Sequence, residues 1–303
     1  MLTLNTGHLY DLNDYRDLSG NASDLAELRR TVCGEYPFLF VYEHPTLYDD
    51  AMMPEAYAPL DHSKEMADAV TAQLRSEGIQ VLDSRDVLPQ SGYPLDDLLM
   101  VTDQHWSTLA AIVMAQNIAG ELNDMTGATL NVDALSPENL DTEVHEKLFM
   151  GKYGQRVGTA FVTPDDIVEY WPKGESHIHA TVFRYNELLE SEGEFREAVT
   201  RTDVLEPDPG KTWNKKAYMD YGLVEPYALS ESPDAPDFTV LLLKDSYSQP
   251  IGVFLSLAAR RVVCVDMRQV VDPLETWLEN YRPDAVVMSY SLQMLRDDAY
   301  DFQ

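Results

Sequence analysis

The run Phe238-Thr239-Val240-Leu241-Leu242-Leu243 is followed at once by Lys244-Asp245-Ser246-Tyr247-Ser248 and then by a predicted helix from about Gln249 to Arg260. A continuous apolar run of this length is typical of a strand buried on both faces of a parallel sheet. Pro250 fits the first turn of the helix, where a missing N–H costs nothing. The strand–turn–helix order therefore predicts an α/β fold with a polar turn at the carboxyl end of a strand.

Ser246 lies in that turn, where open parallel sheets bind their ligands. Its hydroxyl would stand at the edge of the sheet, close to free backbone N–H groups that can stabilise an oxyanion. The competing interpretation is that a serine of the turn merely caps the helix. We assign the cap to Ser248, which comes two residues before Pro250, and this leaves Ser246 available as a nucleophile.

Other segments repeat the pattern of strand and helix on both sides of a less regular middle. Four further strands are predicted at 37–42, 79–83, 261–265 and 283–288, and helices at 21–32, 63–77, 108–123 and 273–281, the last capped by Asp272. Five strands are enough for one sheet. The alternation predicts a three-layer α/β fold, flavodoxin-like in architecture, with a parallel sheet flanked by helices.

The middle of the chain, about 137–235, is rich in Pro, Gly, Tyr and charge and has poor periodicity. We expect it to be an elaboration with short antiparallel strands rather than an independent domain. The chain then forms a single domain over 1–303, with its core at about 23–130 and 236–303. Residues 1–12 are expected to form a short extended or hairpin piece.

A second polar motif, Thr102-Asp103-Gln104-His105-Trp106-Ser107, lies just before the predicted helix at 108–123. Asp103 and His105 are two residues apart, so in extended backbone their side chains point the same way. A carboxylate that accepts from one imidazole nitrogen fixes the tautomer and leaves the other nitrogen free as a base. The motif indicates the base and orienting acid of a catalytic triad; a surface ion pair and a pair of metal ligands are the alternatives.

Together the two motifs resemble those of the SGNH-hydrolase-like alginate O-acetylation proteins AlgJ and AlgX and the related DHHW proteins. In that group Asp-x-His-Trp lies well upstream of a serine in [Gly/Lys]-[Asp/Thr]-Ser-[Phe/Tyr]-Ser. The order is reversed relative to ordinary SGNH enzymes, so the chain is expected to be permuted. Gln104, in place of a second His, and Lys244, in place of the Gly of a GDS motif, are departures. Further similar segments are 41–45, 78–83, 149–157 (with Gly151, Tyr153, Gly154 and Arg156) and 265–268.

The resemblance implies an SGNH-type fold and a serine-dependent O-acetyltransferase or acetylesterase acting on a cell-surface glycan. Ser246 would be the nucleophile, His105 the base and Asp103 the carboxylate that orients it, with no cofactor. A membrane-bound O-acyltransferase would deliver the acyl group, and the protein would be extracellular, at the cell surface or periplasmic. The competing hypotheses are a catalytically inactive SGNH-like glycan-binding or assembly component, and a metal-dependent hydrolase with Asp103 and His105 as ligands.

Other side chains near the motifs are weaker candidates. Arg268, at a strand end, is an oxyanion candidate alongside the Ser246 amide, although we slightly favour an ion pair. Candidates for the wall of a sugar cleft are Trp106, Tyr153, Arg156 and Tyr247, with ordinary packing as the safer interpretation of the aromatic rings. His177 and His179 share one face of a predicted strand, but no third metal ligand is near them in sequence, so no metal is expected.

Composition limits the partners. With 22 basic and 52 acidic residues the net charge is −30 and the pI about 4.3, so nucleic acid and anionic membranes are repelled. Cys33 and Cys264 lie in apolar stretches and are expected to be buried thiols. No stretch reaches the roughly 20 apolar residues that span a bilayer. Residues 1–5 lack the layout of a signal peptide, so the protein is either intracellular or has lost an N-terminal anchor.

Overall fold

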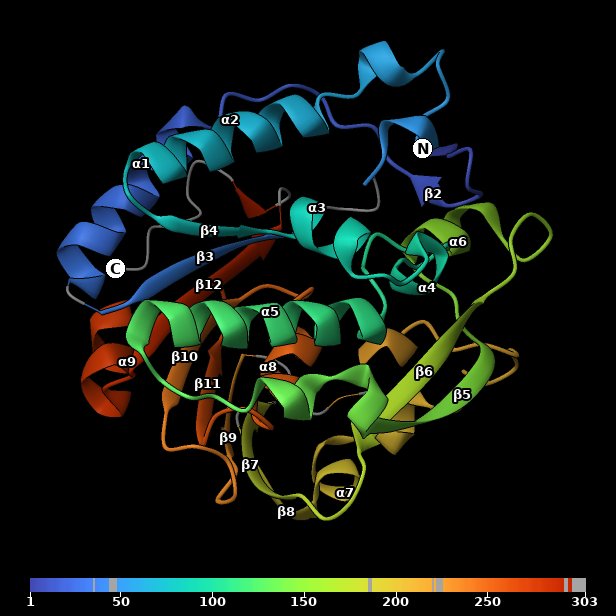
Figure 1. Cartoon of the computed structure of the whole chain (residues 1–303). Coiled ribbons are helices and arrows are strands. Elements are labelled where there is room, and N and C mark those ends of the chain that lie inside the picture. The colour runs from blue at the N-terminus through green and yellow to red at the C-terminus, as the bar shows by residue number, and fades with distance from the viewer. Residues whose placement is uncertain are drawn as a thin grey trace.

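The computed structural model describes residues 1–34, 36–43, 48–184, 187–219, 221, 226–291 and 294–295. Its five parallel strands are β3 (Phe38–Glu43), β4 (Gln80–Asp83), β10 (Thr239–Lys244), β11 (Arg261–Val265) and β12 (Ala285–Ser291). They lie side by side in the order β4-β3-β12-β10-β11 (Figure 1). All five are the predicted strands, with ends within three residues of those expected, because buried parallel strands have an unmistakable apolar signature.

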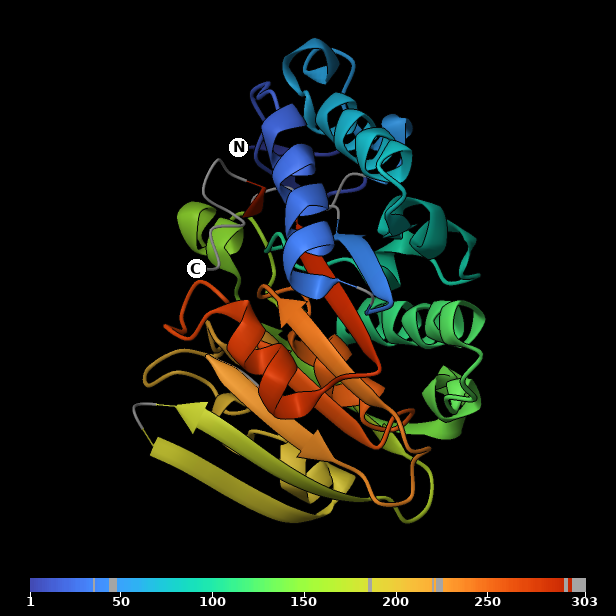
Figure 2. The ribbon, with the colours of Figure 1, turned by 90° about the vertical axis from the view of Figure 1, so that its left-hand side faces the viewer.

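Helices cover both faces of this sheet (Figures 1 and 2). One face packs against α1 (Ser19–Leu28), α2 (Ser63–Ser76) and α9 (Leu274–Tyr281). The other packs against α5 (Thr108–Thr126) and α8 (Gln249–Leu255). The side chains of β10 point alternately to the two faces of the sheet. Leu241 and Leu243 pack on the face covered by α1, α2 and α9, and Val240 and Leu242 pack on the face covered by α5 and α8. The predicted three-layer architecture is confirmed.

The order of the strands in the sheet shows the permutation that the motifs predicted. Counted from the N-terminus, the parallel strands read 2-1-5-3-4, but counted from β10 they read 2-1-3-4-5, which is the flavodoxin-like order. In that order the topological switch point lies between the first and third strands, which here are β10 and β12. Ligands of doubly wound sheets bind outside the carboxyl ends of the strands at this point. The turn that carries Ser246 leaves β10 at this position.

The middle of the chain supplies the predicted antiparallel strands, but three of them extend the main sheet. β9 (Tyr227–Glu231) pairs with β11, β7 (His177–Arg184) with β9, and β8 (Glu187–Glu194) with β7, all antiparallel (Figure 2). β5 (Leu140–Phe149) and β6 (Asp165–Pro172) form a separate antiparallel pair. β1 (Leu2–Thr3) and β2 (Leu9–Tyr10) form the expected N-terminal hairpin. The described short helices are α3 (Ser84–Val87), α4 (Leu95–Leu98), α6 (Lys152–Val157) and α7 (Phe195–Val199).

Several helix ends and caps differ from the sequence predictions. α5 begins at its Ser107 cap and runs to Thr126, three residues beyond the expected end, because Gly127 adopts the left-handed conformation that closes it. α8 ends at Leu255 rather than near Arg260. Ser248 makes no side-chain cap, and Pro273 rather than Asp272 precedes α9.

Two further expectations concern the cysteines and the membrane. Cys33 and Cys264 are fully buried free thiols, as predicted, and burial raises the pKa of each to about 12. Among the described residues, no helix combines the length and apolar character that crossing a bilayer requires.

Candidate active site

Ser246, His105 and Asp103 form one hydrogen-bonded relay. His105 Nε2 lies 2.8 Å from Ser246 Oγ, and His105 Nδ1 lies 2.5 Å from Asp103 Oδ1. The hydroxyl therefore donates to the imidazole nitrogen that faces away from the carboxylate, with the tautomer assigned from the network. The fold therefore brings the two motifs into contact, although His105 and Ser246 are 141 positions apart in the chain. Ser246 is partly exposed, whereas Asp103 and His105 are buried.

The sequence predicted extended backbone between Asp103 and His105, but the structure shows a bend there. Asp103 Oδ1 also accepts from the His105 backbone N–H at 3.2 Å, which is the i to i+2 bond of an Asx turn. A bridge between Leu99 and Trp106 closes the loop, and Ser107 then caps α5. The side chains still meet because a single carboxylate oxygen binds both the ring and the main chain of His105.

Asp103 is held from a second side by α6. Its Oδ2 accepts from the Lys152 backbone N–H at 2.6 Å. Burial opposes ionisation of this carboxyl, but the hydrogen bonds from His105 and Lys152, with the attraction of His105, more than offset burial and keep its pKa below the ordinary value. Asp103 therefore remains an anion that fixes the imidazole and stabilises an imidazolium.

Thr102 and Asp165 anchor the same loop from the opposite side. The carboxylate of Asp165, at the start of β6, accepts from the backbone N–H of Val101 at 2.7 Å and of Thr102 at 2.9 Å, and from the Thr102 hydroxyl. Thr102 Oγ1 in turn accepts from the Gly151 N–H at 2.8 Å. Burial outweighs these hydrogen bonds and raises the pKa of Asp165 to about 6. No sequence signal pointed to Asp165, because its partners are more than sixty residues away.

We expect Asp165→Asn to flatten the pH dependence of the free energy of unfolding. The pKa of Asp165 rises from 3.8 in the unfolded chain to about 6 in the fold. The folded protein thus holds this proton more tightly, and the resulting stability is complete below pH 3.8 and is lost as the pH rises to about 6. The group contributes up to about 3 kcal/mol to this fall. Urea unfolding at pH 4, 5, 6 and 7 measures it. The exposed neighbour Asp166→Asn is the control and should keep the wild-type slope; equal slopes for all three proteins would contradict the prediction.

Two tyrosine rings enclose the imidazole. Tyr218, from a short 3₁₀ turn (Ala217–Met219), stacks on His105 with ring centroids 4.7 Å apart at 21°, and Tyr247 lies 4.6 Å away at 43°. Aromatic faces attract a positive charge, so the two rings could stabilise an imidazolium formed during proton transfer. Tyr218 lies in the irregular middle of the chain, where no periodicity or motif marked it.

The aromatic candidates for a sugar cleft are packed inside the protein. Trp106, Tyr153 and Tyr247 are each less than 5% exposed. Trp106 Nε1 donates to the Tyr247 carbonyl at 3.0 Å, and the Tyr247 hydroxyl donates to the Gln104 carbonyl at 2.8 Å. These rings are therefore part of the packing around the two motifs and do not present faces to a glycan. Arg156 is about half exposed but is paired with Asp11 at 2.7 Å.

Arg268 does not join the triad as an oxyanion donor. Its guanidinium donates through Nε and Nη2 to the buried carboxylate of Asp266, and through Nη1 to Met294 Sδ. The favoured alternative, an ion pair, is what the structure shows. Within the described residues the backbone N–H of Ser246 forms no hydrogen bond, so this amide remains available to an oxyanion.

Lys244, the departure from the GDS glycine, is completely buried at the end of β10. Its ammonium has no hydrogen-bond partner among the described residues. Asp266, which directly follows β11, feels the attraction of this ammonium. Lys244 also lies close enough to Cys264 to act on its thiol electrostatically, and it makes no hydrogen bond to Ser246 among the described residues.

The structure also bears on metal binding. Among the described residues, no group of three or more His, Cys, Asp or Glu side chains is arranged to hold a metal ion. His177 and His179 instead approach Glu194 and Glu231, at 3.4 and 3.7 Å.

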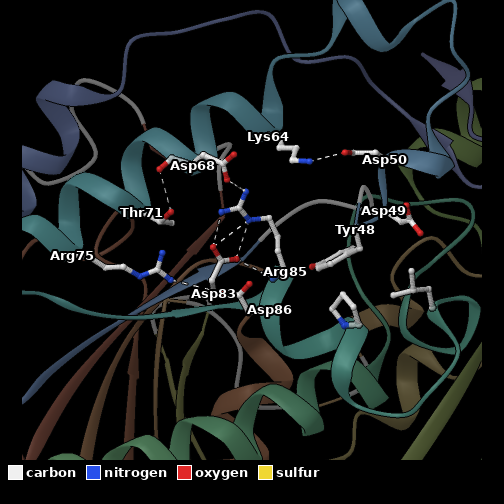
Figure 3. A pocket seen from close by; sticks show the side chains of 12 residues that line it. Tyr48, Asp49, Asp50, Lys64, Asp68, Thr71, Arg75, Asp83, Arg85 and Asp86 are labelled. Carbon is white, nitrogen blue, oxygen red and sulfur yellow. Dashed lines mark hydrogen bonds and ion pairs between the residues drawn. The ribbon is translucent and has the colours of Figure 1, made fainter.

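A cavity of about 570 Å³ opens near the carboxyl end of β4, apart from the triad (Figure 3). The cavity walls are polar, and their basic and acidic side chains form ion pairs. Arg85 donates to Asp83 and to Asp68, and Lys64 lies 2.6 Å from Asp50. No triad residue lines it.

Comparison with known proteins confirms the resemblance seen in the motifs. A family model described as the SGNH hydrolase-like domain of the acetyltransferase AlgX matches residues 38–169, which include Asp103 and His105. No curated protein matches the sequence.

Solved structures extend the similarity to the whole fold. PatB1 of Bacillus cereus has a TM-score of 0.75 at 13% identity, over 97% of this chain and 96% of that one. A DHHW family protein of Eubacterium siraeum has a TM-score of 0.72 at 15% identity, over 96% and 90%. The O-acetyltransferase domain of Pseudomonas putida AlgJ has 0.59 at 13%, over 100% and 95%. At these identities the matches establish the SGNH-like fold.

Proposed function

We propose that this protein is a serine-dependent O-acetyltransferase or acetylesterase that acts on a cell-surface glycan. The observation that carries the proposal is the continuous relay from Ser246 Oγ through the imidazole of His105 to Asp103, with spacings of 2.8 and 2.5 Å. A nucleophile, a base and an orienting carboxylate in this geometry are the requirements of acyl transfer through a covalent intermediate. The AlgX family model and the AlgJ domain support acetyl as the acyl group, and the glycan acceptor is what the resemblance of the motifs implies.

In the first half of the reaction, Ser246 Oγ attacks the acyl carbonyl while its proton passes to His105 Nε2. The carbonyl oxygen becomes an oxyanion, which the free N–H of Ser246 can bind. Asp103, an anion in the fold, stabilises the imidazolium, and the two tyrosine rings enclose the charged ring. Collapse of the tetrahedral intermediate breaks the bond to the leaving group, which takes the proton from His105, and leaves acyl-Ser246.

In the second half, an acceptor hydroxyl gives its proton to His105 and attacks the acyl-serine. A sugar hydroxyl as acceptor makes the enzyme a transferase, and water makes it an esterase. The ester bond to Ser246 then breaks, and the proton on His105 returns to the serine oxygen. Both outcomes use the same three residues, so the acceptor alone separates the two activities.

The partner and location that we propose follow from the family resemblance. A membrane-bound O-acyltransferase would present the acyl group, and the protein would work at the cell surface, in the periplasm or outside the cell. A gene for such a membrane enzyme next to the gene for this chain would support the partnership.

The test is trapping of the covalent intermediate. We expect brief incubation with p-nitrophenyl acetate to add one acetyl group to the intact protein, and peptide mass spectrometry to place it on Ser246. Adding glycan oligosaccharides as acceptors should divert acetyl groups from acetate to acetylated sugar if the enzyme is a transferase. A chelator should leave turnover unchanged.

Each competing function has its own outcome. Absence of both turnover and an acetyl-Ser246 adduct, together with glycan binding that Ser246→Ala leaves intact, would favour the non-catalytic glycan-binding hypothesis. Loss of turnover on chelation would favour a metal-dependent hydrolase. The short contact between His105 and Ser246 favours catalysis, because a recognition surface does not require a base in contact with a hydroxyl.

A further inference from the structure

Two carboxyl groups are buried directly beneath the turn that carries Ser246. Glu43 ends β3 and is 0% exposed; Asp245 directly follows β10 and is 1% exposed. We call Glu43 and Asp245 the buried carboxyl pair. The hydroxyls around the pair are equally enclosed; they belong to Ser248, Ser289 and Ser291. Burying two carboxyl groups side by side is costly unless they are hydrogen-bonded and at most one is ionised.

Asp245 receives three hydrogen bonds from groups outside the pair. Its Oδ1 accepts from the Tyr247 N–H at 2.9 Å, and its Oδ2 accepts from the N–H and the hydroxyl of Ser291 at 2.9 and 2.8 Å. Three donors directed at one carboxylate suit its charged form. These bonds also tie the residue after Ser246 to the end of β12.

Glu43 is the partner that is built to be neutral. Its Oε1 accepts from the hydroxyls of Ser248 and Ser289, each at 2.5 Å. Its Oε2 receives no hydrogen bond in the described part of the chain. Burial first, and then the charge and the hydrogen bond of Asp245, raise the pKa of Glu43 well above its ordinary value. A proton on Oε2 can be donated to Asp245, and this satisfies the oxygen that otherwise has no partner.

We propose that Glu43 is a positioning residue which, as a neutral carboxylic acid, shares its proton with Asp245 and thereby fixes the Ser246 turn to the ends of β3 and β12. Asp245 directly precedes Ser246 in the turn. Glu43 contacts the turn on the other side of Ser246, where it accepts a hydrogen bond from Ser248. The two carboxyl groups thus hold both flanks of the nucleophile in register with His105. The effect on catalysis rests on the proposed function, whereas the shared proton does not.

Other titratable groups near the pair do not remove the need for this proton. Tyr48 lies close enough to Glu43, and Tyr247 close enough to Asp245, for the carboxyl charge to raise the pKa of each phenol. Arg268 attracts Asp245, but its guanidinium is already hydrogen-bonded to Asp266. Lys244, directly before Asp245, is also buried, but its ammonium forms no hydrogen bond with either carboxyl group among the described residues. Ionising Glu43 would therefore place a second buried negative charge beside Asp245 without an ion-pair partner.

The direct test compares Glu43→Gln with the wild type in unfolding experiments from pH 6.5 to 8, where Asp165 has already ionised. Glu43 holds its proton in the fold at pH values at which the unfolded chain has lost it. We therefore expect the unfolding equilibrium constant of the wild type to rise about tenfold per pH unit relative to that of Glu43→Gln. The wild type should also show the infrared carbonyl band of a protonated carboxylic acid, which Glu43→Gln should lack. Glu55→Gln, at an exposed glutamate, is the matched control and should keep both features.

Enzyme activity provides a second, independent test of the proposal. Glu43→Ala should lower kcat on p-nitrophenyl acetate at least tenfold, and Glu43→Gln, which can still accept from Ser248 and donate to Asp245, should recover most of the loss. Parallel pH profiles of stability together with an unchanged infrared spectrum would overturn the proposal, whatever the enzyme does. A difference in the pH profile without any esterase activity would uphold the shared proton and count against the proposed function alone.

Discussion

Ser246→Ala is expected to lower kcat/KM for p-nitrophenyl acetate by about 10⁴-fold or more, down to residual catalysis by binding and the oxyanion site. The hydroxyl is the only group of the relay that can form the acyl bond, and it contacts His105 Nε2 at 2.8 Å. Initial rates and the intact mass after incubation with the ester measure the loss. His105→Ala should lose about as much, and the double variant no more than either, because residues that act as a unit are not additive.

The fold should tolerate this change. Ser246 is partly exposed and its hydroxyl bonds only to His105 among the described residues, so the free energy of unfolding should shift by no more than about 1 kcal/mol. Ser23→Ala, at an exposed hydroxyl in α1, is the control and should retain full activity. Near-wild-type turnover by folded Ser246→Ala would refute the serine mechanism.

Gly151→Ala is expected to impair both activity and stability. A Cβ at this position would lie 2.3 Å from Asp103 Cβ, 2.5 Å from Asp103 Oδ2 and 2.7 Å from the Thr102 carbonyl oxygen. Two of these neighbours are backbone or the first carbon of a side chain, so they cannot rotate away. We expect overpacking to cost about 1–3 kcal/mol of unfolding free energy. A displacement of Asp103 by about 1 Å should lower kcat about 100-fold.

The control for this variant is Gly20→Ala. Gly20 lies exposed in α1 with nothing within 4 Å of a new Cβ, so alanine should leave activity unchanged and stability equal or slightly higher. Thermal unfolding and kcat on the same ester compare the two proteins. Full activity in Gly151→Ala would show that the approach of α6 to Asp103 is looser than the structure indicates.

The sequence predicted the triad because its members sit in two short motifs, each placed by a local signal. Ser246 follows an unmistakable buried strand, and Asp103 and His105 precede a helix with a clear apolar stripe. The role of Arg268 was harder to predict, because an arginine at the end of a strand can bind either an oxyanion or a neighbouring carboxylate. Only the position of Asp266, two residues earlier and buried, decided between them.

By itself the sequence determined the five parallel strands and the main helices on both faces of the sheet, and it singled out Ser246, His105 and Asp103 as candidates, because apolar periodicity and motif spacing are properties of contiguous residues. The tertiary structure alone decided which side chains support that relay: Tyr218 against His105, Asp165 beneath Thr102, and Glu43 beside Asp245. Each of these partners is distant in the chain. Their contacts depend on how the layers pack and how the strands are ordered, and no local pattern in the chain encodes either.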